Sequence, residues 1–299
     1  MKIGLIDVDG HNFPNLALMK ISAYHKAKGD EVEWCVPLKH YDRVYQSKVF
    51  NDTYSPDIDF IPQADEIYKG GTGYDLKNKL PEEIEKIYPD YMLYPNLAKE
   101  TSYGFLTRGC PRGCPFCIVA EKEGRCSKQV ADLSEWHHSQ PHIKLLDPNL
   151  LACKDHIALL QQLVTSNAYV DFTQGLDIRL TNEENIDLIN RVKLKEIHFA
   201  WDNPKEDLEK YFKKYASKAK HKPHGHFGTV YCLTNFNSTL EEDLYRIYTL
   251  RGWEFDPYVM IYDKPNAPQL IRHLQRWCNN KIIFRSEPDF QKYDPRFSK

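Results

Sequence analysis

The stretch that decides the fold is Cys110-Pro-Arg-Gly-Cys114-Pro-Phe-Cys117, which spaces three thiols as C-x3-C-x2-C. Thiolates are the ligands that iron–sulfur clusters and other soft metal centres prefer. Three thiolates on one loop can bind three irons of a cubane cluster and leave the fourth iron without a protein ligand. Such an open coordination position lets a substrate or cofactor bind the metal directly. Gly113 gives the loop conformational freedom, while the two prolines stiffen it.

Two other kinds of metal site also use cysteines at short spacing. Structural zinc takes four ligands, usually as two C-x2-C pairs. This chain has one such pair, and Cys126, nine residues after Cys117, is the available fourth thiol. Bacterial ferredoxins use C-x2-C-x2-C, which does not fit the first interval here. The spacing favours a cluster with an open iron, and zinc remains the alternative.

The cysteine segment resembles the cluster-binding loop of the radical SAM superfamily, C-x3-C-x-aromatic-C, with Phe116 at the aromatic position. In that family the open iron chelates S-adenosylmethionine, and one electron cleaves it to a 5'-deoxyadenosyl radical. The resemblance implies a [4Fe-4S] cluster on Cys110, Cys114 and Cys117, with S-adenosylmethionine as cofactor. A reductant such as flavodoxin or ferredoxin is the implied partner. Phe116 and the backbone of Ile118 are then expected to lie against the adenine, because aromatic faces stack on bases.

Residues 1 to about 100 alternate between strand and helix patterns. The expected strands are 2–7, 31–36, 43–50 and 66–69, and the expected helix is 15–28. Strand, helix and strand with short connections imply parallel pairing and a small Rossmann-like open α/β domain. Ligands of such sheets bind beyond the carboxyl ends of the strands.

Two loops at those ends resemble the cobalamin-binding domain that precedes the barrel in one subgroup of radical SAM enzymes. Asp9-x-His11-x-x-Pro14 stands where cobalamin proteins carry D-x-H-x-x-G, and Gly70-Gly71 stands where that domain places glycines near the cofactor tail. The resemblance implies His11 as a cobalt ligand, since neutral imidazole binds metals well. Pro14 departs from the glycine of the motif. The alternative is a retained domain shape whose loops cap the active site or hold substrate.

A connector rich in Pro and Tyr, about 72–102, precedes a second rhythm of six strand–helix units. The expected strands are 103–107, 143–146, 169–173, 196–200, 228–233 and 258–262, and the expected helices include 154–164, 182–192, 205–215 and 240–250. This count predicts a partial (β/α)6 TIM-like barrel with its site at the carboxyl ends of the strands. It also agrees with the architecture of the radical SAM family. The predicted domains are therefore 1–100 and 101–299.

Polar residues at the barrel strand ends are the remaining candidates for cofactor binding. In chain order they are Asp147, Asn149, Gln174, Asp177, Arg179, Asp202 and Asn235. In the family, the end of the second strand holds the methionine amino group, which requires an acceptor such as Asp147 or Asn149. Asp177 is expected to bind ribose hydroxyls and Arg179 the methionine carboxylate. A surface Asp–Arg pair is the alternative for these two residues.

Composition and charge argue against a nucleic-acid-binding, membrane-spanning or disulfide-rich secreted protein. A net charge of −2 over 299 residues gives no global basic field. The basic run 210–222 suits RNA, although a solvated helix face is the favoured interpretation, so nucleic acid is not the expected partner. No apolar run approaches the roughly 20 residues of a membrane span, and no signal peptide is recognised. Eight cysteines are too few for a disulfide scaffold, which predicts the cytoplasm.

These observations predict a radical SAM enzyme whose 5'-deoxyadenosyl radical abstracts hydrogen from a substrate at the barrel mouth. A cobalamin-dependent radical SAM methyltransferase is the second hypothesis, and a zinc-stabilised RNA-binding module is the third. No residue pattern identifies the substrate or further catalytic residues. The isolated cysteines at 35, 153, 232 and 278 are expected in the core, and Cys126 receives no role.

Overall fold

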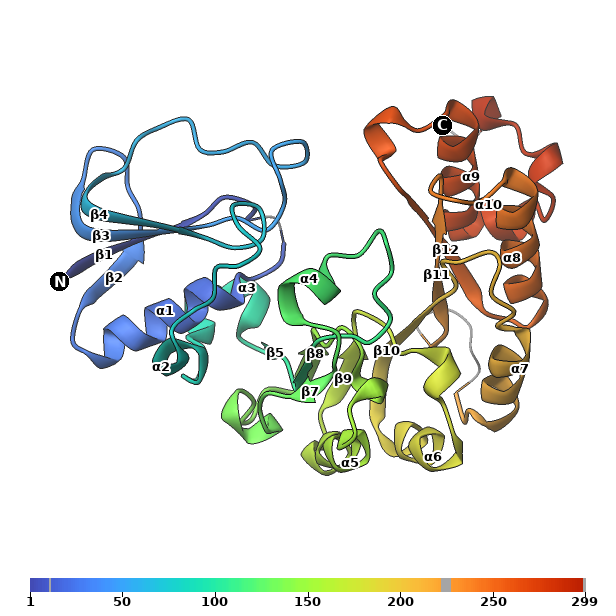
Figure 1. The fold of residues 1–299 in the computed structure, drawn as a ribbon, viewed down its shortest axis with the longest axis horizontal. Coiled ribbons are helices and arrows are strands. Elements are labelled where there is room, and N and C mark those ends of the chain that lie inside the picture. The colour runs from blue at the N-terminus through green and yellow to red at the C-terminus, as the bar shows by residue number, and fades with distance from the viewer. Residues whose placement is uncertain (11, 222–226, 298–299) are drawn as a thin grey trace. The chain divides into compact units, whose positions relative to one another are not determined.

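The computed structural model describes residues 1–10, 12–221 and 227–297 (Figure 1). They form two compact units, Met1–Leu146 and Asp147–Lys299. The predicted domain boundary near residue 100 lies inside the first unit and stays a prediction. Within the described ranges, no helix combines the length and apolarity needed to cross a membrane.

The first unit begins with a parallel four-stranded sheet in the order β2-β1-β3-β4. Its strands are β1 (Lys2–Asp7), β2 (Glu31–Trp34), β3 (His40–Ser47) and β4 (Gln63–Gly70). On one face, α1 (Leu16–Ala27) buries Leu18 against Ile3 and Leu5. The opposite face buries Ile6 beside Ile58 and Phe60 from the β3–β4 connection. The predicted open α/β sheet is confirmed.

β3 lies three residues earlier than the predicted strand 43–50. Its register with β1 places Arg43 opposite Ile3 and Ser47 opposite Asp7, so the end of β1 also ends β3. Among the residues that the structure describes, no strand pairs with 48–50, and Phe50 is exposed.

The rest of the first unit carries short elements. They are α2 (Glu82–Glu85), α3 (Pro95–Ala98), β5 (Thr101–Gly104), β6 (Thr107–Arg108), α4 (Val119–Glu123), β7 (Lys128–Gln129) and β8 (His142–Leu145). β5 pairs with β8 from Thr101 to Gly104 and ends before the predicted 107. At Gly104 a Cβ atom would lie 2.3 Å from the Trp136 ring, so only glycine fits this packing.

The second unit repeats strand and helix. Its elements are α5 (His156–Ser166), β9 (Tyr169–Phe172), α6 (Glu183–Arg191), β10 (Lys193–Ala200), α7 (Glu209–Lys218), β11 (Thr229–Thr234), α8 (Leu240–Gly252), β12 (Asp256–Ile261), α9 (Gln269–Asn279) and α10 (Lys281–Ser286). With β5 and β8, its strands complete a six-stranded sheet in the order β12-β11-β10-β9-β8-β5. Six parallel strands joined through helices confirm the architecture of a partial barrel.

One face of the second unit's sheet is apolar and covered by helices. Phe199 on β10 packs edge-on against Phe212 and Tyr215 of α7, with ring centroids 6.2 and 4.8 Å apart. Because side chains alternate along a strand, the neighbours Glu196 and His198 lie on the other face. The sheet therefore buries its apolar face under helices and keeps a polar face.

Candidate active site

The three cysteines predicted to bind the cluster lie on one loop between β6 and α4. The base of this loop is closed by backbone hydrogen bonds, because Cys110 N donates to Gly124 O at 3.1 Å. Gly109 has a φ of +89°, and a Cβ atom there would lie 2.2 Å from the carbonyl oxygen of Cys126. Gly109 is thus required for the close approach that brings the two ends of the loop together.

The tip of the loop carries Cys114 and Cys117. Cys117 N donates to Cys114 O at 3.0 Å, which makes a tight turn between them. Gly113 has a φ of +57°, in the left-handed region where glycine is favoured. Cys110 and Cys114 are half-buried, Cys117 is exposed, and none forms a disulfide. Accessible thiols on one short loop suit an iron–sulfur cluster that keeps an open face.

Ion pairs anchor the base of the loop. Arg108 donates to Glu123 at 2.9 Å and to Glu85 at 3.2 Å. Glu85 also accepts from Lys20 on α1 at 3.0 Å, and burial lowers the pKa of Lys20. The loop is therefore tied to the helices beside the N-terminal sheet within the first unit. Of the predicted adenine contacts, Phe116 is half-buried and Ile118 is exposed at the start of α4.

Of the four isolated cysteines expected in the core, three are buried and one is half-buried. Cys153, Cys232 and Cys278 are buried, and burial raises the pKa of Cys232 to about 12, which makes it inert as a nucleophile. Cys35 is half-buried beside the core of the first sheet. Cys126 is exposed, so it is available to solvent and to metals.

Three of the predicted strand-end residues in the second unit, Asn149, Asp177 and Arg179, form one polar cluster with Glu206. Asn149 Nδ2 lies 3.5 Å from Asp177 Oδ2. Asp177 accepts from Arg179 Nε at 2.7 Å and from Arg179 Nη2 at 3.2 Å. Arg179 also pairs with Glu206. The predicted alternative of an Asp–Arg pair is thus present in this structure, and binding of S-adenosylmethionine by these residues stays a prediction.

The remaining strand-end candidates are Asp147, Gln174, Asn235 and Asp202. Asp147 is buried two residues after the end of β8, and Gln174 is exposed two residues after the end of β9. Asn235 adopts a left-handed backbone with φ of +63° after β11 and donates to Tyr262 O at 2.8 Å. The amide of Asn235 therefore joins the ends of β11 and β12.

Asp202, at the end of β10, accepts a hydrogen bond from Leu233 N at 3.1 Å. Its carbonyl accepts from Arg246 at 3.0 Å. Burial raises the pKa of the Asp202 carboxyl from its ordinary 3.8 to about 6, while the hydrogen bond and the nearby Arg246 and Arg179 guanidinium groups act in the opposite direction. The folded state therefore holds a proton on Asp202 more tightly than the unfolded chain does.

This pKa shift predicts a pH effect on stability. Protonation of Asp202 contributes stability that is fully present below about pH 4 and is lost as pH rises through about 6. Asp202→Asn keeps an acceptor for Leu233 and removes the buried charge, so at pH 8 it should raise the free energy of unfolding by up to about 3 kcal/mol. Urea denaturation between pH 5 and 8 measures the gain, which should shrink toward pH 5. A gain that does not change with pH would contradict the assignment.

The residues predicted to bind cobalamin lie at or just after the ends of strands β1 and β4, at the carboxyl edge of the N-terminal sheet, and their surroundings differ from one residue to the next. Gly71 has a φ of +96°, and a Cβ atom there would lie 2.2 Å from Lys48 O, so glycine is required where this loop packs against the end of β3. A Cβ atom at Gly70 would meet nothing within 4 Å. His11 lies outside the described residues. Asp9 is buried and accepts from the backbone N–H of Phe50 at 3.4 Å.

Two features of the second unit were missed by the sequence predictions. Asp171, Glu196 and His198 place one ligand atom each within 4.8 Å of one another. Glu196 and His198 are two residues apart in a strand whose other face is apolar, and this alternation was the available signal.

The second missed feature is Arg246, which is fully buried in α8 and donates to the carbonyls of Trp201, Asp202 and Leu233 at 2.5, 3.0 and 2.9 Å. The pattern of apolar and polar residues along the helix does not show whether such an arginine is buried or exposed to solvent.

No family model matches the sequence, and no curated protein matches it either. Among solved structures, the chain is similar to the radical S-adenosylmethionine methyltransferase TsrM from Kitasatospora setae, determined with cobalamin and a [4Fe-4S] cluster bound. The TM-score is 0.61 at 11% sequence identity, and the match covers 87% of this chain and 74% of that chain.

The chain shares the fold of that enzyme. The predicted resemblance to the subgroup with an N-terminal cobalamin-binding-like domain is confirmed at the level of the fold. At 11% identity the likeness does not extend to substrate or reaction. The reaction chemistry is therefore inferred from the chain's own residues, above all those of the cysteine loop.

Proposed function

We propose that the chain is a radical SAM enzyme in which Cys110, Cys114 and Cys117 hold a [4Fe-4S] cluster. The observation that carries the proposal is the C-x3-C-x2-C loop between β6 and α4 of a radical SAM fold. When bound, the cluster supplies the electron that cleaves S-adenosylmethionine to a 5'-deoxyadenosyl radical, which abstracts hydrogen from the substrate. Asp147, Asn149, Asp177 and Arg179 are proposed to bind the methionine and ribose parts of the cofactor.

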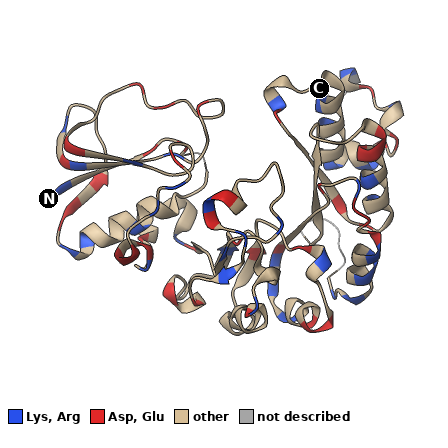
Figure 2. Ribbon diagram, in the orientation of Figure 1, with Lys and Arg blue, Asp and Glu red and all other residues tan. Residues whose placement is uncertain are grey.

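The direct test is product formation by protein reconstituted anaerobically with iron and sulfide. With dithionite as reductant, S-adenosylmethionine should yield 5'-deoxyadenosine, and a sample without reductant should not. Protein that carries about four irons per chain and never cleaves the cofactor would contradict the proposal. One zinc and no iron, together with salt-dependent RNA binding, would favour the zinc-stabilised module instead. Two Lys side chains of α7 pair with acidic groups, Lys213 with Glu209 and Lys218 with Glu183, which argues against that module. Basic and acidic residues are also mixed along the ribbon of both units (Figure 2).

A cobalamin-dependent methyltransferase is the second candidate, favoured by the fold shared with an enzyme whose structure contains cobalamin. The N-terminal sheet offers open space at Gly70, where a cofactor tail can approach the backbone. Cobalamin would supply a methyl carrier, while the sheet edge would supply the binding surface.

Gly70→Val tests this candidate without disturbing the fold, because the added side chain points into open space. Wild-type protein is expected to take up about one cobalamin per chain during anaerobic reconstitution, read from its visible absorption after gel filtration. Gly70→Val should bind at least about tenfold more weakly, since a branched side chain blocks close approach. Asp65→Val, on the exposed part of the same strand, is the matched control and should bind normally. Absence of cobalamin from well-folded wild-type protein would remove the candidate.

A further inference from the structure

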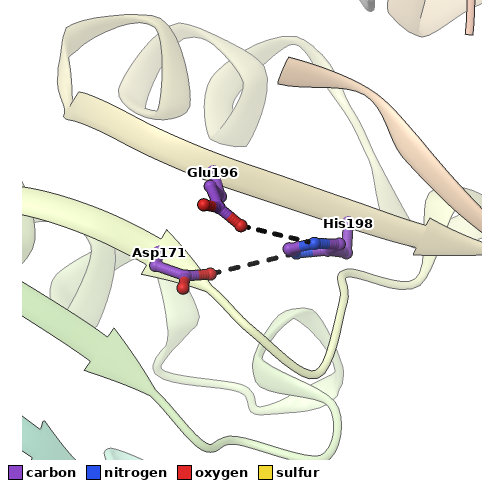
Figure 3. Close-up of side chains that lie close together, drawn as sticks. All are labelled: Asp171, Glu196 and His198. Carbon is purple, nitrogen blue, oxygen red and sulfur yellow. Dashed lines mark ion pairs between the residues drawn. The ribbon is translucent and has the colours of Figure 1, made fainter. Parts of the chain in front are cut away.

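The polar face of the second unit's sheet carries a compact group of three side chains, Asp171, Glu196 and His198 (Figure 3). Asp171 comes from β9, and Glu196 and His198 come from β10. An irregularity in the β9–β10 register between Leu194 and Glu196 sets Glu196 directly opposite Asp171. Two carboxylates therefore face each other across neighbouring strands.

Two carboxylates that face each other repel, and a bound cation would reduce that repulsion. Like charges directly opposite in a sheet destabilise it, and Asp171 is only 1% exposed, so water screens its charge poorly. Glu196 and His198 are more accessible, with side chains 31% and 11% exposed. A cation can therefore reach the group from the open side.

The imidazole of His198 is held in a defined orientation. Its Nδ1 lies 3.2 Å from Phe172 O, a carbonyl that can only accept, so Nδ1 carries the hydrogen. Nε2 is then the nitrogen with a lone pair, and it faces Glu196. The ring stacks on Tyr231 at 5.2 Å with an interplanar angle of 5°. Histidines that bind metals usually have this arrangement, with the second ring nitrogen donating to a backbone carbonyl.

The spacing of the polar atoms is wider than direct hydrogen bonding. His198 Nε2 lies 3.8 Å from Glu196 Oε2, and one ligand atom from each of the three residues lies within 4.8 Å of the others. Hydrogen bonds between such atoms measure about 2.7–3.2 Å. Ligand atoms of a tetrahedral metal with bonds of about 2.1 Å lie about 3.4 Å apart. The 3.8 Å between His198 Nε2 and Glu196 Oε2 is closer to the spacing of metal ligands than to the length of a hydrogen bond.

We propose that Asp171, Glu196 and His198 bind a divalent transition-metal ion, separate from the iron–sulfur cluster. One imidazole nitrogen and two carboxylate oxygens suit ions such as Mn²⁺, Fe²⁺ or Zn²⁺. Three protein ligands leave at least one coordination position open, to which an oxygen atom of a substrate can bind. The ion would neutralise the two facing carboxylates and provide an anchor on the polar face of the sheet.

The probe for this site is Mn²⁺, titrated into full-length protein whose cluster is oxidised and whose adventitious metal has been removed by chelation. Electron paramagnetic resonance of free Mn²⁺ gives the stoichiometry and affinity. Wild-type protein should bind one ion per chain. Glu196→Gln and Asp171→Asn should each weaken binding at least about tenfold, because each removes a charged ligand. Glu241→Gln, an exposed carboxylate on α8, is the matched control and should bind like wild type.

Glu196→Gln is the decisive variant, since its partly exposed side chain is the one of the three least needed for packing. Superimposable Mn²⁺ titrations of wild type and folded Glu196→Gln would overturn the proposal, as would no stoichiometric binding by wild type. Cys114→Ser protein should keep the Mn²⁺ site. Failure of this proposal is thereby distinguished from failure of the proposed cluster.

Discussion

Cys114→Ser protein is expected to contain no [4Fe-4S] cluster and to release no 5'-deoxyadenosine above the level of a blank without protein. A serine hydroxyl is a poor ligand for this soft cluster, and the remaining thiols at Cys110 and Cys117 leave two irons without protein ligands. The same loss is expected for serine at either of those positions. Iron and sulfide analysis, visible absorption and product chromatography on reconstituted protein measure the effect together.

Cys126→Ser is the matched control for these variants, because Cys126 lies near the loop and is exposed like Cys117. It should retain iron content and cofactor cleavage close to wild type. Loss of iron from Cys126→Ser equal to that from Cys114→Ser would mean that four thiolates hold the metal. A four-thiolate site has no open position, and the proposed chemistry would then be excluded.

Arg246→Met should lower the free energy of unfolding by about 3–5 kcal/mol, the usual effect of breaking a buried ion pair. The guanidinium of Arg246 is fully buried, pairs with Asp243 at 2.5 Å and donates to the carbonyls of Trp201, Asp202 and Leu233. Methionine fills much of the same volume, so most of the effect comes from the stranded carboxylate and carbonyls. Chemical denaturation followed by fluorescence and circular dichroism gives the midpoint and slope.

Two companion variants separate this explanation from a general sensitivity of the fold. Arg191→Met removes an exposed arginine that lies 3.9 Å from Asp187, and it should change stability by less than about 1 kcal/mol. Adding Asp243→Leu to Arg246→Met removes the stranded carboxylate and should recover part of the loss. No recovery in the double variant would show that the Asp243 charge is not the source of the effect.

The positions of strands were largely predictable because apolar runs in a parallel sheet are short and nearly continuous. The runs at 2–7, 169–173 and 228–233 correspond closely to β1, β9 and β11. Strand ends were less predictable, since they depend on the partner. β3 ends opposite Asp7 at the end of β1, and no local feature of residues 40–50 shows where that happens.

The three loop cysteines could be identified as candidate metal ligands because they lie within eight residues of sequence, and their spacing is typical of one kind of metal site. Groups of side chains that come together from different strands could not be identified in this way. Asp171 and Glu196 are separated by 25 residues, and only the register of β9 with β10 places them opposite each other. Arg246 occupies one turn of an amphipathic helix, and its burial follows from the carbonyls it meets after β10 and β11. Long-range pairing, rather than local pattern, assembles these groups.

The central claim is that the cluster keeps one iron open and that S-adenosylmethionine binds there. The most direct measurement is electron–nuclear double resonance on the reduced cluster, with S-adenosylmethionine carrying ¹⁵N in its amino group. We predict a nitrogen coupling to the cluster that appears with the labelled cofactor and is absent without it. A reduced cluster whose spectrum is unchanged by the cofactor, or reconstituted protein that forms no cluster, would contradict the account.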